Sequence, residues 1–310
     1  MNRIKIFSLL FATISIFIFS CKDEEDPVES PVKEYTAIAA KFGSAFDLNS
    51  LPNYANQTIP NYITKDNTAG NDITDKGALL GRVLFYEKIL SVDSTVSCAS
   101  CHLQEYAFGD PDAASTGVNG TTGRHSMRLI NARFAEESKF FWDERANTLE
   151  EQTTMPIQDH GEMGYSGENG DPSLADLIVK LNNTDYYNEL FEFVYGDAAV
   201  TEERMQDALA QFVRSIQSFD SEYDEGRAVA PNNNAPFNNF TADENAGKQL
   251  FTAPPQFDQN GVRVAGGVGC AGCHRPPEFD IDPQSGNNGV IGSLDGGNDF
   301  TNTRSPSLRD

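Results

Sequence analysis

Two five-residue motifs of the form Cys-x-x-Cys-His constrain this 310-residue chain more than any other feature. They are Cys98-Ala99-Ser100-Cys101-His102 and Cys270-Ala271-Gly272-Cys273-His274. Two thiols at this spacing can attach one porphyrin covalently, and the histidine that follows can bind its iron. We therefore expect two c-type haems. One is held by Cys98, Cys101 and His102, and the other by Cys270, Cys273 and His274.

Two other interpretations of the cysteines stay open at this stage. The motifs contain four of the five cysteines and two of the four histidines. A structural zinc ion needs four ligands within tetrahedral reach, whereas the two cysteine pairs lie roughly 170 residues apart. A thioredoxin-like redox pair explains neither the trailing histidines nor the duplication. Both alternatives therefore account for less of the pattern than two haems do.

The net charge of −23 limits the partners. A strongly acidic chain is repelled by nucleic acid and by anionic membrane surfaces, so we expect neither as a partner. The charge is compatible with a well-solvated exported protein or with one that docks a basic electron donor.

The first twenty residues predict a signal peptide that is not part of the fold. Arg3 and Lys5 give it a positive start, and residues 6–19 are almost wholly apolar. Cys21 follows a small residue, as in bacterial lipoproteins, so we expect a lipid anchor at Cys21; ordinary secretion is the alternative. Covalent haem attachment also requires export. We therefore expect a periplasm-facing or cell-surface lipoprotein, with residues 21–51 as its lipidated N-terminus and flexible tether.

The folded part contains an internal repeat. A capped helix that starts near residue 74 and another that starts at Thr241 both contain the pattern Gly-x-x-Leu-Phe, at Gly81 and at Gly247. A haem motif follows each helix, which is the order of a cytochrome-c unit. We expect each glycine to let its helix approach another backbone or the haem closely.

Helical spacing predicts further helices over residues 172–181, 186–195 and 201–218, whereas sustained strand alternation is absent. The predicted fold class is mainly α, with two cytochrome-c-like haem domains and long loops. The turn-rich stretch 232–236 divides an N-terminal domain, residues 52–235, from a C-terminal domain, residues 236–310.

The region between the haem motifs reads FWDERANTLEEQTTMPIQDHGEMG from Phe140 to Gly164, and SPSLR stands at residues 305–309. With the two haem motifs, these phrases resemble the bacterial dihaem cytochrome c peroxidase family, which includes the MauG-type members. The resemblance extends roughly from Asp75 to Leu308. The family continues for tens of residues beyond this segment, so we expect a C-terminally truncated chain whose electron-transfer domain, residues 236–310, is incomplete.

The resemblance implies roles for five side chains. Trp142 matches the tryptophan that relays electrons between the haems. Glu162 matches a distal carboxylate that moves a proton between the oxygens of hydrogen peroxide, and Gln152 matches its hydrogen-bonding neighbour. His102 and His274 match the iron ligands of the peroxidatic and the electron-transfer haem. Without the resemblance, core packing for Trp142 and a solvated helix face for Gln152 and Glu162 are the alternatives.

The chain departs from the family pattern after the first haem motif. Many members carry a histidine in the loop that corresponds to residues 117–123, whereas this loop has none. We therefore expect a first haem that is five-coordinate at rest, as in MauG-type members. His125 stands near the place of an asparagine that, in the classical members, helps to hold calcium between the domains. A histidine is a poorer calcium ligand than an asparagine, so a calcium ion stays an open alternative that the residue type disfavours. A hydrogen-bonding role and iron ligation are the two alternatives for His125.

The resemblance implies a peroxidase that reduces hydrogen peroxide to water. Its electrons come through the second haem from a small donor protein such as a cytochrome or a cupredoxin, and a homodimer is a further expectation. The alternatives are a MauG-like oxidase of a protein or organic substrate, and a dihaem electron carrier without catalysis.

Overall fold

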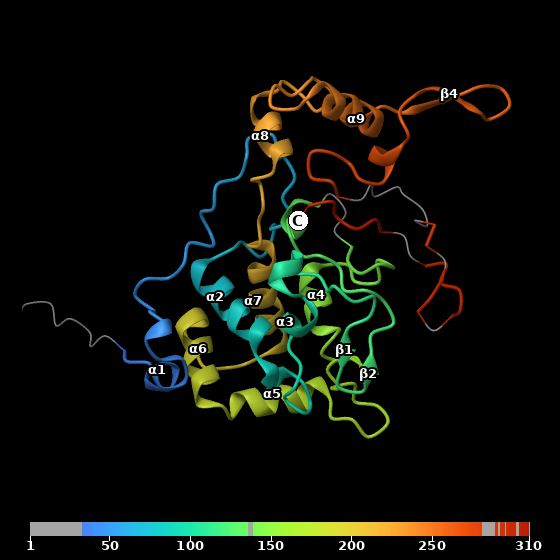
Figure 1. Cartoon of the computed structure of the whole chain (residues 1–310). Coiled ribbons are helices and arrows are strands. Elements are labelled where there is room, and N and C mark those ends of the chain that lie inside the picture. The colour runs from blue at the N-terminus through green and yellow to red at the C-terminus, as the bar shows by residue number, and fades with distance from the viewer. Residues whose placement is uncertain are drawn as a thin grey trace, which may run out of the picture. The chain divides into compact units, whose positions relative to one another are not determined.

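Helices dominate the computed structural model, which describes residues 33–135, 139–280, 289–290, 292–294, 296–301 and 304–309 (Figure 1). The predicted mainly α fold class is confirmed. The predicted signal peptide and Cys21 lie outside the described residues. Among the residues that the structure describes, no helix has the length and apolar character needed to cross a membrane.

The elements belong to residues 35–310, which form one unit in their contacts. The predicted division between residues 235 and 236 stays a prediction. The helices are α1 (Thr36–Phe42), α2 (Asp75–Tyr86), α3 (Cys98–Cys101), α4 (Leu149–Thr154), α5 (Leu174–Asn182), α6 (Asp185–Tyr195), α7 (Glu202–Arg214), α8 (Glu222–Val229) and α9 (Ala242–Thr252), with a 3-10 turn, η5, over Cys270–Gly272. Two short antiparallel hairpins pair β1 (Thr116–Gly117) with β2 (Gly120–Thr121) and β3 (Pro255–Phe257) with β4 (Arg263–Gly266).

The caps predicted from the sequence start the helices where they were expected. The Thr74 hydroxyl accepts a hydrogen bond from the Gly77 N–H over 2.9 Å at the start of α2. Thr241 and Glu244 form a capping box at the start of α9. Side-chain oxygens at these positions satisfy N–H groups that have no partner within the helix.

Helix α7 ends at Arg214, four residues earlier than its apolar stripe predicted. The Asn131 N–H donates to the Ile216 carbonyl over 2.9 Å. The Asn131 side chain bonds both the N–H and the carbonyl of Ser218, over 3.0 and 2.8 Å. These bonds to Asn131 take the place of the hydrogen bonds that a longer α7 would form. A buried backbone group needs a hydrogen-bond partner, and any segment of the chain can supply it.

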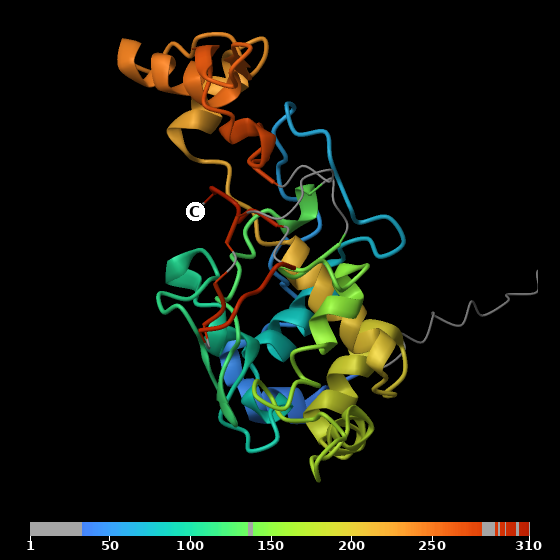
Figure 2. The same cartoon turned by 90° about the vertical axis from the view of Figure 1, so that its right-hand side faces the viewer.

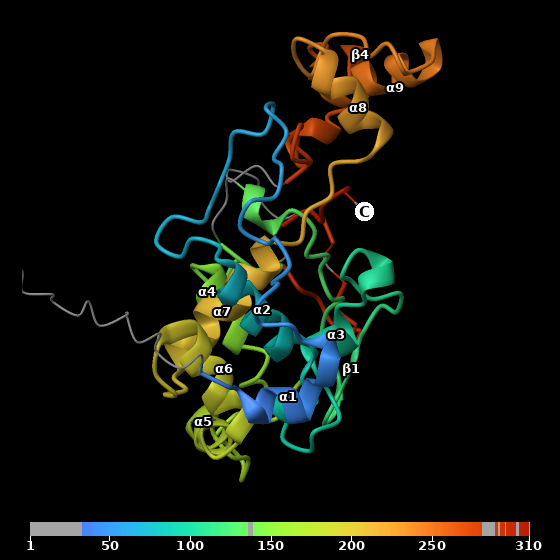
Figure 3. The same ribbon diagram turned by 90° about the vertical axis from the view of Figure 1, so that its left-hand side faces the viewer.

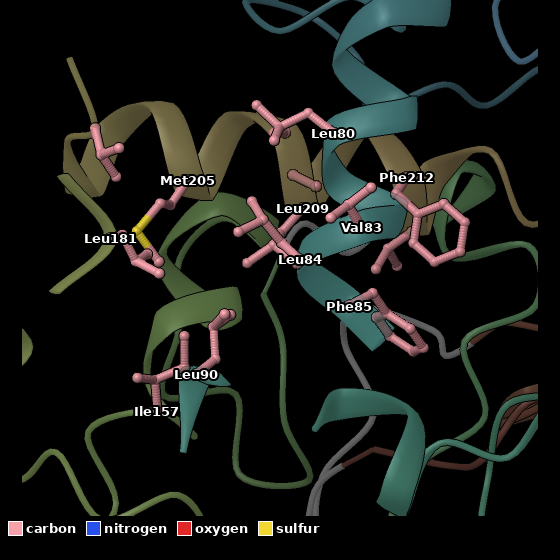
Figure 4. Packing of buried hydrophobic residues seen from close by; sticks show 14 of the residues in the cluster. Leu80, Val83, Leu84, Phe85, Leu90, Ile157, Leu181, Met205, Leu209 and Phe212 are labelled. Atoms are coloured by element: carbon pink, nitrogen blue, oxygen red, sulfur yellow. The ribbon is translucent and has the colours of Figure 1, made fainter. Parts of the chain in front are cut away.

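The core forms where α2 packs against α7 (Figure 4). Leu80 and Leu84 of α2 face Met205 and Leu209 of α7, and none of the four side chains is more than 1% exposed. Gly81 allows the close approach, because a Cβ atom there would lie 1.9 Å from the Ala208 carbonyl oxygen. The expectation for this glycine is confirmed.

The corresponding glycine of the second repeat unit has different surroundings. No chain atom among the described residues lies within 4 Å of a Cβ atom built at Gly247. Helix α9 buries none of its residues, so it makes no close helix contact of the kind that constrains Gly81. The sequence repeat is therefore matched in secondary structure but not in packing.

The C-terminal segment, residues 299–301 and 304–309, returns from the second haem motif to the first. Asp299 and Thr301 contact Arg124, which follows the first haem motif. Residues 304–309 end beside the connection between α7 and α8, where Arg309 donates to the Ser218 carbonyl (Figures 2 and 3). The Arg304 N–H donates to the Trp142 carbonyl over 3.2 Å. The segment thereby contributes residues to the cavity described below.

Replacing Gly81 with alanine tests the packing of α2 on α7. We expect Gly81→Ala to lower the free energy of unfolding by about 1–3 kcal/mol, because the new methyl group overlaps backbone atoms of α7. Urea unfolding of the haem-loaded chain measures the change. Gly247→Ala is the matched control, with equal or up to about 1 kcal/mol higher stability from helix propensity. Equal losses in both variants would contradict the packing account.

Candidate functional site

The first Cys-x-x-Cys-His motif folds as the single helical turn α3, which ends at His102. The Ser97 and Ser100 side chains cap this turn reciprocally. The His102 N–H donates to the Cys98 carbonyl over 2.9 Å. Residues three apart share a face of a helical turn, so Cys98 and Cys101 are presented together.

The backbone holds the His102 imidazole in one tautomer. Nδ1 lies 2.8 Å from the Phe108 carbonyl oxygen, which can only accept, so Nδ1 carries the proton and donates it. Ala107 and Phe108 adopt left-handed φ angles of 57° and 58° in the turn that presents this carbonyl. Burial lowers the pKa of His102 and keeps the ring neutral. Nε2 therefore retains the lone pair with which imidazole binds a metal.

The ligand groups around the first motif do not match a structural zinc site. Within the described ranges no three Cys, His, Asp or Glu side chains come together as a ligand set. Burial raises the pKa of Cys98 to about 12 and also raises the pKa of Cys101. Two thiols and an imidazole presented by one helical turn instead fit the covalent attachment of a c-type haem.

A cavity of about 500 Å³ lies beside α3. This volume is in the range of pockets that hold organic ligands and cofactors. Its wall is mostly apolar, with a few polar groups that come from distant parts of the chain. Seven predicted site residues line it: Cys98, Cys101, His102, His125, Trp142, Gln152 and Glu162. The wall and the ligand set together fit a porphyrin that is attached at α3.

Glu162 is a half-buried carboxyl on the wall of this cavity. Burial, and then the charge of Asp159, raise its pKa to about 7, while Arg145 acts in the opposite direction. The Glu162 carbonyl accepts the Val118 N–H over 3.0 Å. Asp159 Oδ1 accepts the Glu162 N–H over 3.0 Å. A carboxyl with a pKa near neutrality can both take up and release a proton there.

Gln152 reaches the cavity from α4. Helix α4 is attached to α7 by an ion pair between Glu150 and Arg214, whose side chain is only 5% exposed. The Glu150 carboxylate also accepts a hydrogen bond from the Asn71 side chain over 2.7 Å. The core therefore fixes the helix from which Gln152 projects.

Trp142 is half-buried, and its Nε1–H donates to the His125 carbonyl over 2.8 Å. His125 Nδ1 lies 2.9 Å from the Asp112 carbonyl, so Nδ1 is the protonated nitrogen of that ring. The structure thus gives His125 hydrogen-bonding contacts, and iron ligation by His125 stays a prediction.

The second motif shares one backbone hydrogen bond with the first, although it folds as the 3-10 turn η5 and not as an α-helical turn. The His274 N–H donates to the Cys270 carbonyl over 2.9 Å, as in the first motif. Burial lowers the pKa of His274, and the Pro306 backbone acts in the opposite direction. Within the described residues, no hydrogen bond of acceptable geometry reaches the buried Nδ1. Cys270, Cys273 and His274 do not line the cavity of the first motif. The two motifs are therefore separate sites.

Asp159, beside Glu162, was not predicted. Its Oδ1 accepts the N–H groups of Gly161 and Glu162, which forms the turn that presents the carboxyl. The phrase Asp-His-Gly-Glu is a turn signal that could have identified Asp159.

Ser305 and Ser307 of the SPSLR phrase also line the cavity, a position that the phrase alone did not predict. Glu278 on the cavity wall gave no local signal, because its position depends on tertiary packing.

Comparison with known proteins places these features in a family context. A family model described as di-haem cytochrome c peroxidase matches residues 75–229, half of the chain, including the first motif, Trp142, Gln152 and Glu162. The methylamine utilization protein MauG of Methylophilus methylotrophus is 31% identical over 149 residues, or 48% of this chain and 42% of that protein. Cytochrome-c peroxidase IdrP1 of Pseudomonas sp. (strain SCT) is 31% identical over 201 residues, which are 64% of this chain and 46% of that protein. The chain spans about half the length of these curated relatives.

Solved structures agree with the fold. A MauG-like protein associated with microbial copper homeostasis superposes with a TM-score of 0.52 at 28% identity. The match covers 64% of this chain and 55% of that protein. A variant of the diheme peroxidase BthA from Burkholderia thailandensis, 23% identical with a TM-score of 0.50, shares the fold over 71% of this chain and 53% of that one.

Replacing Gly117 with alanine tests how the hairpin positions Glu162. A Cβ atom there would lie 2.0 Å from the Gly161 carbonyl oxygen and 2.8 Å from the Glu162 Cα. We expect Gly117→Ala to cost about 1–3 kcal/mol of unfolding free energy, measured in urea, and to move the titration of the Glu162 carboxyl, measured by infrared difference spectroscopy. Gly123→Ala in the same loop is the control, since apart from its chain neighbours no atom of the described residues lies within 4 Å of a Cβ atom built there. An unchanged Glu162 titration in Gly117→Ala would count against this account.

Proposed function

Because the chain belongs to the di-haem cytochrome c peroxidase family, we propose that it reduces hydrogen peroxide to water. One peroxide, two protons and two electrons give two waters, and the electrons come from an external donor through the second haem. The observation that carries the proposal is the half-buried Glu162, with a pKa of about 7, in the cavity that also contains His102.

The chain carries two c-type haems, one for each Cys-x-x-Cys-His motif. When bound, the haem iron supplies the electrons and the Lewis acidity for cleavage of the O–O bond. His102 holds the first iron through Nε2, because the Phe108 carbonyl occupies Nδ1. The apolar wall excludes bulk water, which strengthens every polar interaction inside the cavity.

Glu162 carries the proton chemistry in this proposal. As a carboxylate it takes a proton from hydrogen peroxide, and as a carboxylic acid it returns that proton to the departing oxygen. Because burial raises the pKa of Glu162 to about 7, its carboxylate is a stronger base than an ordinary one, which supports the first half of this cycle. Gln152 offers an amide on the same wall that can orient the peroxide.

Trp142 is the proposed electron relay. Its indole is a large, oxidisable ring on the cavity wall, held by one hydrogen bond from Nε1. His274 would hold the iron of the second haem, which would supply a redox centre for electrons from the donor. The proposed units are the peroxidatic domain, residues 52–235, and the electron-transfer domain, residues 236–310.

The donor and the cellular location follow from charge and chemistry. The chain is an exported protein, because covalent haem attachment takes place after export. We propose a lipid anchor at Cys21. The proposed donor is a small cytochrome or cupredoxin with a basic docking face, which complements the net charge of −23.

A MauG-like oxidase that acts on a protein or organic substrate is the second candidate. The absence of a histidine from residues 117–123 favours it. The two candidates differ in stoichiometry with a reduced small cytochrome. A peroxidase oxidises two cytochromes for each peroxide, whereas the MauG-like oxidase consumes peroxide with little oxidation of the cytochrome.

Replacing Glu162 with glutamine tests the proton-transfer role. We expect Glu162→Gln to lower peroxide turnover by about 10²–10⁴-fold with both haems retained, because an amide cannot accept the proton. Steady-state oxidation of a reduced donor measures the loss, and the haem absorbance confirms loading. Glu168→Gln, an exposed carboxyl in the following loop, is the control and should turn over normally. Unchanged turnover in Glu162→Gln would remove Glu162 from the mechanism.

The pH dependence gives a separate test. The proton-accepting form of Glu162 is the carboxylate, so the rate of peroxide reaction should fall as the pH drops through about 7. Stopped-flow measurement between pH 5 and pH 9 checks this at saturating donor. The same profile in Glu162→Gln should lose that inflection, and a retained inflection would assign it to another group.

A further inference from the structure

Arg124 is a charged side chain on the cavity wall that the proposed reaction does not use. Its Nη1 donates to Asp143 over 2.8 Å, and its Nη2 donates to Asp299 over 2.5 Å and to the Thr301 hydroxyl over 2.8 Å. Its Nε also donates to Asp299, over 2.9 Å. The side chain is only 28% exposed. One guanidinium therefore joins the segment around Trp142 to the C-terminal segment.

The main chain next to Arg124 holds Trp142 directly. The Trp142 Nε1–H donates to the His125 carbonyl, and Asp143, which Arg124 binds, follows Trp142 in the sequence. His125 thus holds Trp142 through its backbone carbonyl, and Arg124 holds Asp143 through an ion pair. A tryptophan side chain has only two torsion angles. The hydrogen bond at Nε1 and the ion pair of the adjacent Asp143 therefore leave the Trp142 indole little freedom.

The C-terminal segment connects this contact to the second haem motif. Its Arg304 N–H donates to the Trp142 carbonyl over 3.2 Å. At its other end, the Arg309 guanidinium donates to the Pro277 carbonyl over 2.7 Å. Pro277 lies three residues after His274. The segment therefore contacts the proposed relay at one end and the loop after the second iron ligand at the other.

On the basis of the proposed relay role of Trp142, we propose that Arg124 is a positioning residue for electron transfer between the two haems. It fixes Trp142 and the C-terminal segment in one arrangement by binding Asp143 and Asp299 at the same time. An isolated surface ion pair contributes little. Arg124 matters because it connects two segments that are far apart in the sequence, those of Asp143 and Asp299. Electron transfer is also sensitive to the placement of the relay.

The arrangement also predicts a dependence on salt. Both ion pairs are partly exposed, and the screening length falls from about 30 Å at 0.01 M to about 3 Å at 1 M ionic strength. High salt should therefore slow electron transfer between the haems in the wild type and have a smaller effect in a variant that lacks the ion pairs.

The test uses the full chain with both haems and no peroxide. Electrons are delivered rapidly by a photochemical reductant, and transient absorption follows their redistribution between the haems. We expect Arg124→Gln to slow the redistribution about tenfold or more, because misplacement of a positioned group by about 1 Å is costly. Ultraviolet resonance Raman of the single tryptophan provides an independent readout, and we expect its indole N–H hydrogen-bond marker to shift.

Three further variants keep the test decisive. Asp299→Asn weakens the contact with the C-terminal segment while Arg124 keeps its hydrogen bond to Thr301, and it should give a smaller slowing in the same direction. Arg124→Lys keeps the positive charge but loses the guanidinium that binds Asp143 and Asp299 at the same time. It should therefore recover only part of the electron-transfer rate. Arg204→Gln, which loses an exposed ion pair with Asp197 away from the cavity, should behave as the wild type.

The outcomes separate this inference from the proposed function. Slowed redistribution and a shifted tryptophan marker in Arg124→Gln and Asp299→Asn, with normal haem content, support the inference. Wild-type rates and an unshifted marker in both variants overturn it. Trp142→Phe tests the relay itself. If redistribution slows in Trp142→Phe but keeps the wild-type rate in Arg124→Gln, only the positioning role of Arg124 fails. If Trp142→Phe redistributes electrons at the wild-type rate, the relay role fails and the positioning role fails with it.

Discussion

The hydrogen bond between His102 Nδ1 and the Phe108 carbonyl determines what the first site can do. It fixes the tautomer and leaves Nε2 as the only nitrogen that can bind iron. The core supports this bond, because Phe85 at the end of α2 lies against both rings, with centroids 6.4 Å from His102 and 6.0 Å from Phe108. The α2–α7 packing that buries Leu84 is therefore also what holds the imidazole in place.

The remaining chemistry of the cavity comes from loops that backbone hydrogen bonds hold in place. The Val118 N–H donates to the Glu162 carbonyl, and the Val92 N–H donates to the Met163 carbonyl over 2.9 Å. The segment that carries Glu162 is thus fixed from two sides without belonging to a helix. The C-terminal segment is anchored in a similar way, since Arg309 forms a buried ion pair with Asp224 over 2.8 Å. Loops fixed in this way can present a carboxyl in a precise place while they leave room for a large cofactor.

Local signals in the sequence predicted the helices well and the cavity only in part. Thr74, Ser173 and Thr241 cap helices at or next to the predicted starts, because capping depends on a few adjacent residues. Helix α8 was missed although Ser221 and Asp224 form a capping box. The end of α7 could not be predicted, because its competing partner, Asn131, lies far away in sequence. The same holds for Arg124 and Asp299, which are 175 residues apart. Proximity of that kind is decided by packing, and no short pattern records it.

The proposed function requires that a small oxidant can reach the iron that His102 would hold, in the cavity that also contains Glu162. Resonance Raman spectroscopy of the full chain with both haems, before and after addition of cyanide, tests it most directly. The account predicts that one haem is high-spin at rest and becomes low-spin as it binds cyanide, while the other haem is unchanged. Two low-spin haems that both ignore cyanide, before and after reduction of the protein, would contradict the account and leave only electron transfer.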